Sequence, residues 1–312
     1  MDKQTLANYG WLVITILVLA TIIALAAPFA GSIRDNFVGV VNRISGEAQK
    51  GFDKIENPDG GGSGGGGGGE DWDPATYPGV DHDTGEILDP WEIIIENIHN
   101  GTYLTKYQIG YWKPLESHST LNMQIVSMHG DDNPDDDDLL ADGSGYASVT
   151  WIAMNFISQP WYMNSGRQNT GGWADCNMRT FIQGYYSCMA DFVQDAILEV
   201  EKTYYDDNVG QTLKCADKLW IPSIREVGLT VAKGKYEDSG PVYSGIFADD
   251  ASRIKTETHV AYGNIDDWWL RTSYSFYYNN TTYTYFQSVT YRGLADNEYP
   301  DYKKGVVIGF CM

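Results

Sequence analysis

The side chains best suited to catalysis, four cysteines and five histidines, are scattered along the 312-residue chain. They are Cys176, Cys188, Cys215 and Cys311, and His82, His99, His118, His129 and His259. No C-x-x-C pair occurs, which disfavours zinc and thioredoxin-like sites, and the spacing assembles no Ser-His-Asp or Cys-His set. The cysteines fit either two disulfides or buried free thiols. We therefore expect a protein that is not an enzyme and has no catalytic residues and no cofactor.

An acidic run, GDDNPDDDDLLADG at residues 130–143, carries the carboxylates that calcium prefers. It lacks the D-x-[DN]-x-[DN]-G spacing and the final Glu of an EF-hand loop. A solvated acidic loop is therefore favoured over a calcium site at residues 131–138, and no metal site is predicted.

A Tyr-rich stretch has the composition of a ligand-binding surface. Six of the 21 residues in SYSFYYNNTTYTYFQSVTYRG, residues 273–293, are Tyr, and most of the others are Ser, Thr and Asn. Antibody combining sites use the same composition, because Tyr offers a large, stiff surface with a polar tip. An ordinary edge sheet is the alternative, since Tyr and Thr favour strands.

A hairpin that turns near Asn279 and Asn280 would gather these side chains on one surface. The predicted ligand-binding residues are Tyr274, Phe276, Tyr277, Tyr278, Asn279, Asn280, Tyr283, Tyr285 and Tyr291.

The net charge of −21 narrows the choice of partner. Residues 1–69 hold five Lys and Arg against six Asp and Glu, so residues 70–312 carry −20. Such a field repels nucleic acid and anionic lipid headgroups. Nucleic acid is therefore not expected as a partner. The predicted ligand of the Tyr-rich surface is an extracellular protein or glycan.

The N-terminal segment predicts a membrane contact. WLVITILVLATIIALAAPFA, residues 11–30, has no charged residue and is long enough to cross a bilayer. Its length favours a retained helix over a cleaved signal peptide. The positive-inside rule, applied to the four basic residues that follow, would keep the rest of the chain inside, but the acidic residues between them indicate a helix built for packing.

After Gly31 apolar residues recur at steps of three and four, which predicts an amphipathic continuation of this helix. The first 56 residues resemble pilin-like leader helices, although the Glu five residues after a Gly is missing. A plain membrane anchor, or self-assembly of the helix into a filament, fits the same pattern.

A Gly-rich stretch separates this helix from the rest of the chain. PDGGGSGGGGGGEDWDP, residues 58–74, has few side chains that could pack and is typical of a flexible tether. The predicted organisation is a helix at 1–57, a linker at 58–75 and a ligand-binding head at 76–312.

Within the head, helices are expected early and strands late. Asp89 is placed to cap a helix that begins at Pro90. Residues 121–130 and 145–157 favour strands, and residues 171–205 favour two helices divided near Gly184. From Asp267 onward the pattern is strand-like, so the predicted class is α+β.

Several blocks of the head resemble, in order, an uncharacterised bacterial surface-protein family, a domain of unknown function. The blocks are WEIIIENIHNGTY, YQIGYWKPL, MQIVSMHGDD, GGWADCNMRTFI, DKLWIPSIREV, SRIK, DDWWLRTS and GVVIGFCM. In members of that family the corresponding blocks read DKLWLPS-x-x-E, SRIK, WWLRSP and GV-x-FGFC. That family is distantly similar to the C-type-lectin-like fold of formylglycine-generating enzymes and of retroelement-diversified variable proteins. The resemblance implies a C-type-lectin-like head on the long N-terminal helix.

Paired tryptophans seal a core and an adjacent Arg needs acceptors, so Trp269 and Arg271 are predicted to belong to the scaffold rather than to a ligand contact. The resemblance leaves the Tyr-rich interval as the exposed face. The reactive cysteine pair of formylglycine-generating enzymes does not carry over, because Cys311 lies in a scaffold block. Every residue of 273–292 except Gln287 belongs to the set that adenine-directed mutagenesis of AAC-like codons yields. The predicted function is that of an adhesin, membrane-anchored or in a pilus with its head outside the cell. The alternative is a structural pilin.

Overall fold

The computed structural model describes residues 79–312 except 116–117, 158, 231–236, 238 and 256–266. The described residues all belong to one compact unit, Trp72–Met312. The predicted membrane-spanning and amphipathic helix and the Gly-rich linker lie outside them, as does the filament alternative that depends on residues 1–57. Among the residues described, no helix combines the length and apolar character that a membrane span needs.

A six-stranded sheet forms one layer and has the order β1-β2-β3-β4-β5-β11. Its strands are β1 (Val80–Asp81), β2 (Glu86–Ile87), β3 (Trp112–Leu115), β4 (His118–Met128), β5 (Val149–Ala153) and β11 (Gly309–Cys311). All neighbours are antiparallel except β2 and β3. The C-terminal strand β11 adds to β5 with Phe310 opposite Trp151, so the end of the chain completes the sheet.

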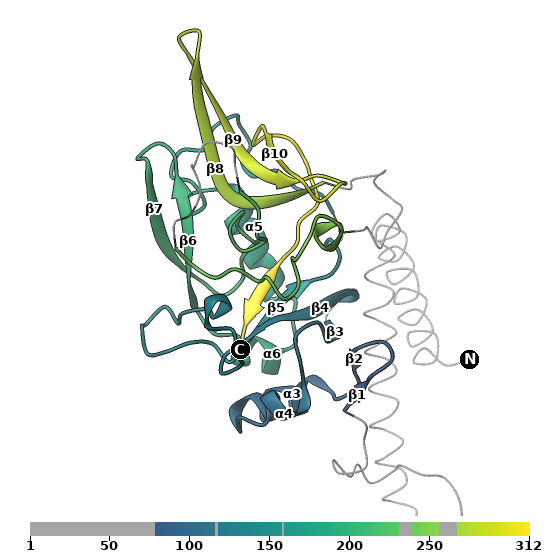
Figure 1. The fold of residues 1–312 in the computed structure, drawn as a ribbon. Coiled ribbons are helices and arrows are strands. Elements are labelled where there is room, and N and C mark those ends of the chain that lie inside the picture. The colour runs from purple at the N-terminus through teal and green to yellow at the C-terminus, as the bar shows by residue number, and fades with distance from the viewer. Residues whose placement is uncertain (1–78, 116–117, 158, 231–236, 238, 256–266) are drawn as a thin grey trace, which may run out of the picture. The chain divides into compact units, whose positions relative to one another are not determined.

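Two smaller antiparallel sheets position the Tyr-rich segment. One has the order β10-β9-β8, and the other pairs β6 with β7. Their strands are β6 (Val200–Asp206), β7 (Gln211–Asp217), β8 (Trp268–Tyr278), β9 (Thr281–Val289) and β10 (Ala295–Glu298). In Figure 1 the β8–β9 hairpin extends away from the six-stranded sheet, and β6 runs beside its base.

The helices are short: α3 (Trp91–His99), α4 (Tyr103–Lys106), α5 (Asn177–Tyr186) and α6 (Asp191–Ala196), with 3-10 turns at Pro134–Asp136 and Ala251–Arg253. The predicted cap at Asp89 is wrong, because Pro90 is the N-cap and makes no side-chain cap bond. Asp89 instead accepts a hydrogen bond from the Tyr107 hydroxyl at 2.8 Å. The two helices predicted in residues 171–205 are present as α5 and α6, but the division between them falls at residues 187–190, because Gly184 lies inside α5.

The predicted fold class is corrected as well. Among the described residues the fold is sheet-rich, with 34% strand and 17% helix, and it contains no long helix. The predicted α+β, C-type-lectin-like class is therefore wrong for the head, whereas the predicted long helix lies outside the described residues. One cause lies in residues 200–205, for which the sequence predicts a helix; they belong to β6 because β7 pairs with them directly across a short turn.

Tryptophans fill the core between the sheets. Trp91, Trp151, Trp173, Trp220, Trp268 and Trp269 are fully buried. The rings of Trp91 and Trp151 lie 5.0 Å apart. Gly309 in β11 passes so close to Trp220 that a Cβ at this position would stand 2.5 Å from the indole. The terminal GFC segment is thus fitted to the core by the lack of a side chain at Gly309.

Candidate functional site

The Tyr-rich segment forms a tight two-stranded hairpin. Tyr278 pairs with Thr281, which leaves Asn279 and Asn280 as a two-residue turn. Both Asn residues have positive φ, 48° and 58°, as a type I′ turn requires. The turn predicted at these two residues is therefore present, and its twist matches that of the strands.

The two faces of the hairpin differ in burial. Ser273, Ser275 and Phe286 point inward and are buried. Because successive side chains of a strand point to opposite faces, the residues that alternate with these, and their cross-strand partners, lie on the other face of the hairpin. We call this set the aromatic face; it consists of Tyr274, Phe276, Tyr278, Tyr283 and Tyr285.

Exposure rises toward the hairpin tip. Phe276 is 38% exposed, Tyr278 is 59% exposed and Tyr277, on the other face, is 69% exposed. The Tyr277 hydroxyl donates to Asn280 Oδ1 at 3.1 Å, which ties the tip to its turn. The tip therefore presents large aromatic side chains to solvent on both faces.

Four rings of the aromatic face form an ordered array, in which Tyr283 stacks on Phe276 with centroids 5.1 Å apart. The centroids of Tyr274, Phe276 and Tyr285 are mutually 6.1 to 6.4 Å apart. Their planes differ by only 25° between Tyr274 and Phe276, and by 8° between Phe276 and Tyr285. The rings therefore share nearly one orientation.

A groove of about 360 Å³ runs along this array. Its lining consists of Tyr274, Phe276, Tyr285, Asp296 and Asn297. We call it the hairpin groove. Asp296 Oδ1 accepts the backbone N–H of Asn297 at 2.8 Å, and Asn297 Oδ1 accepts a hydrogen bond from Gln287 Nε2. The polar side of the groove is thus held in place by β9 and β10.

The aromatic surface continues past the hairpin. Tyr285 packs 4.9 Å from Tyr299, and the Arg167 guanidinium lies 4.2 Å above the Tyr299 ring. Burial and the hydrogen bond with the Tyr299 hydroxyl raise the pKa of Tyr285 to about 12. The Tyr285 phenol therefore stays neutral at physiological pH.

Tyr291 lies apart from the other predicted site residues. It follows β9, is 52% exposed and carries the Arg292 guanidinium 5.1 Å above its ring. Its backbone N–H donates to Asp267 Oδ1 at 2.8 Å. The groove lining does not include it. Asp296 and Asn297, which do line the groove, were missed because their short β10 strand has no aromatic signal.

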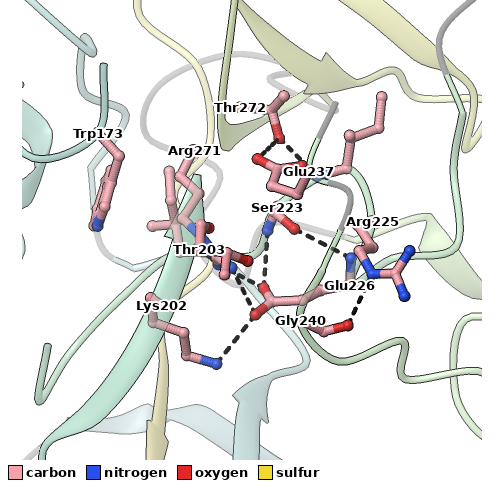
Figure 2. A network of polar contacts seen from close by, with 12 residues as sticks. Trp173, Lys202, Thr203, Ser223, Arg225, Glu226, Glu237, Gly240, Arg271 and Thr272 are labelled. Carbon is pink, nitrogen blue, oxygen red and sulfur yellow. Dashed lines mark hydrogen bonds and ion pairs between the residues drawn. The ribbon is translucent and has the colours of Figure 1, made fainter. Parts of the chain in front are cut away.

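A buried charge cluster anchors the base of the hairpin, and Figure 2 shows three of its members, Lys202, Glu226 and Arg271. It consists of Asp138, Lys202, Glu226, Tyr243 and Arg271, all buried. Arg271 on β8 forms two hydrogen bonds to Glu226, at 2.5 and 2.7 Å. Its Nε also donates to the Thr203 carbonyl at 2.7 Å, which joins β8 to β6.

Lys202 on β6 completes the cluster. Its Nζ donates to Asp138 Oδ1 and, at 3.1 Å, to Glu226 Oε1. The same ammonium lies 3.4 Å from the Trp220 ring centroid. Two buried cations thus face the two carboxylates of this cluster.

The electrostatics of the cluster keep it ionised. Burial alone would raise the pKa of the Glu226 carboxyl, but the charges of Arg271 and Lys202 outweigh it and lower that pKa to about 2. Burial lowers the pKa of Lys202, and the carboxylates of Asp138 and Glu226 more than reverse this. With no exposed atom at its centre, this cluster serves the scaffold, as expected for Arg271 and Trp269.

Among the described residues, Cys215 and Arg179 both contact the Asp217 carboxylate, and Cys311 lies 3.4 Å from Asp138 of the charge cluster. All four cysteines are free thiols. Burial raises the pKa of Cys176 to about 12, so this thiol is a poor nucleophile. No three His, Cys, Asp or Glu side chains come together as a metal site within the described parts of residues 79–312.

The acidic run has separate partners for its carboxylates. Asp136 accepts from Ser127, Asp137 contacts His129 and Asp138 pairs with Lys202. These three carboxylates are thus each engaged by a different side chain.

The described residues form a sheet-rich domain in which an exposed aromatic hairpin is anchored by the buried charge cluster. The chain belongs to a family described as a domain of unknown function, DUF6273, which matches residues 148–312. The match spans β5 to β11 and therefore includes the hairpin. It also includes the charge cluster except Asp138. Neither the curated proteins nor the solved structures contain a significant match to this chain.

Proposed function

We propose that this protein works by binding, with the aromatic face and the tip of the β8–β9 hairpin as its ligand surface. The observation that supports this is the exposure of Tyr277 and Tyr278, at 69% and 59%, on a hairpin whose base is buried. Contiguous exposed aromatic surface is typical of partner sites. A base fixed by Arg271 and Glu226 reduces the ordering cost of binding.

The test uses the full chain, purified in detergent, on arrays of extracellular proteins and glycans. The double variant Tyr277→Ser, Tyr278→Ser is expected to bind about 30-fold more weakly, since truncating a hot-spot aromatic costs about 2 kcal/mol or more. Tyr146→Ser is the matched control, because Tyr146 is 48% exposed and stacks on His129, away from the hairpin. Equal binding by the folded double variant would rule the hairpin out.

In this proposal the head is displayed outside the cell, as an adhesin would be. An antibody raised against residues 79–312 is then expected to label intact cells. Labelling that appears only after the cells are permeabilised would contradict display.

We also propose that residues 273–292 are diversified by a retroelement. The exposed tip supports this, because substitutions at Tyr277 and Tyr278 would leave the core intact. Sequencing the genomic neighbourhood tests it. A near-identical template repeat beside a reverse transcriptase gene is expected, and the absence of both would refute diversification.

A further inference from the structure

We infer that the ligand of the hairpin groove is a neutral carbohydrate chain, with sugar rings stacked on Tyr274, Phe276 and Tyr285 and with hydroxyls bound by Asp296 and Asn297. This inference rests on the proposed function, because it names the ligand class of the same surface. It adds two side chains, on β10, that the Tyr-rich sequence does not contain.

Ring orientation distinguishes between classes of ligand. Tyr274, Phe276 and Tyr285 lie within 31° of parallel, so their faces point in nearly the same directions. A site for an organic cation needs ring faces turned toward one common point. Parallel rings suit a ligand with repeated flat faces, as the C–H faces of successive pyranose units provide. The electron-rich face of an aromatic ring attracts these weakly positive C–H groups.

The polar side chains of the groove can hydrogen-bond the hydroxyl groups at the edge of a sugar ring. Asn297 Oδ1 is occupied by Gln287 Nε2, so the Asn297 amide offers its N–H groups as donors. The Asp296 carboxylate accepts hydrogen bonds, and its Oδ1 is oriented by the Asn297 backbone N–H. A donor and an acceptor beside an apolar wall fix a ligand that has hydroxyls at its edge and C–H groups on its face.

Charge and size restrict the carbohydrate. The −20 carried by residues 70–312 disfavours acidic polysaccharides as well as nucleic acid. The groove volume of about 360 Å³ lies near the lower end of the range of about 300–1,000 Å³ for small-molecule sites. A short stretch of a neutral chain therefore fits the groove.

The test titrates the full chain, in detergent, with cellohexaose, chitohexaose, maltohexaose and mannohexaose by isothermal calorimetry. At least one is expected to bind. Phe276→Ala and Asp296→Ala are each expected to weaken that binding about tenfold or more, while Tyr146→Ser leaves it unchanged. Circular dichroism of each variant establishes that the fold is retained.

The opposing outcomes separate this inference from the proposed function. If none of the four sugars binds, the carbohydrate inference fails, and a protein ligand lost in the Tyr277→Ser, Tyr278→Ser variant would leave the proposed function standing. If a sugar binds equally to wild type, Phe276→Ala and Asp296→Ala, the groove is not the site. Tetramethylammonium that displaces the bound sugar at comparable concentration would overturn the choice of a neutral ligand.

Discussion

At the scale of single residues, the most consequential side chain is Arg271, which neutralises Glu226 beneath the hairpin. Arg271→Met removes one cation and leaves the buried Glu226 carboxylate with Lys202 as its remaining ion-pair partner. We expect a loss of about 3–5 kcal/mol in the free energy of unfolding, as for other broken buried pairs. Urea unfolding of the variant and of wild type measures it.

Arg167→Met is the matched control for that substitution. Arg167 pairs with Asp301 at 3.2 Å but is 54% exposed, so its ion pair is expected to contribute about 0–1 kcal/mol. Equal destabilisation by the two variants would mean that burial of the Arg271 pair carries no special weight.

The same cluster predicts a response to acid. The folded-state pKa of Glu226 is about 2, below the ordinary value of 4.5, so its stabilising contribution is complete above about pH 4.5. That contribution is lost as the pH falls from about 4.5 toward 2. In ¹³C-Glu NMR, the Glu226 resonance is expected to remain that of a carboxylate at pH 4. A midpoint near 4.5 would contradict the ion pairs.

The burial of Lys202 could not be predicted from the sequence. A lysine in a polar stretch such as VEKTYY indicates a solvent-facing side chain, yet Lys202 is fully buried. Its partners Asp138 and Glu226 lie 64 and 24 residues away in the chain. No local pattern joins them, whereas Trp269 beside Arg271 suggested a buried Arg through its aromatic neighbours.

At the scale of elements, the hairpin depends on its two-residue turn. Asn280 has φ of 58°, where β-branched residues are strained. Asn280→Val is expected to destabilise the hairpin by about 1–2 kcal/mol, the cost of the left-handed conformation. Amide hydrogen exchange of β8 and β9 near the tip should then speed up.

Asn280→Gly supplies the control for the turn. Gly adopts positive φ without strain, and Asn-Gly is a preferred type I′ pair. The Gly variant is expected to keep the slow exchange of wild type. Fast exchange in both variants would assign the effect to the lost Tyr277–Asn280 hydrogen bond.

Local signals predicted some elements and missed others for physical reasons. The Asn279–Asn280 turn was foreseeable because few residues accept positive φ twice in succession. Strand β6 was not foreseeable, because its pairing with β7 and its packing on β8 override the helical tendency of the preceding residues. The hairpin groove was half predicted: its rings lie in the Tyr-rich run, but Asp296 and Asn297 reach it only through the pairing of β10 with β9.

At the scale of the whole molecule, the scaffold brings distant segments of the chain together below the β8–β9 hairpin. The C-terminal strand β11 closes the six-stranded sheet, and Trp220 packs against its Gly309. Three sheets meet around tryptophans that come from the whole described chain. A sequence pattern gives the faces of single elements, but their assembly depends on contacts between residues far apart, and for this reason the predicted fold class failed.

The net charge of the whole chain determines how the binding of different ligands depends on salt concentration. Binding of the neutral oligosaccharide is expected to change less than about twofold between about 50 and 500 mM NaCl, because no counterions are released. Polylysine, which the −20 of residues 70–312 attracts, should lose its binding steeply over the same range. Calorimetry at the two salt concentrations measures both. A steep loss of oligosaccharide binding would mean that charge, rather than stacking on Tyr274, Phe276 and Tyr285, holds the ligand.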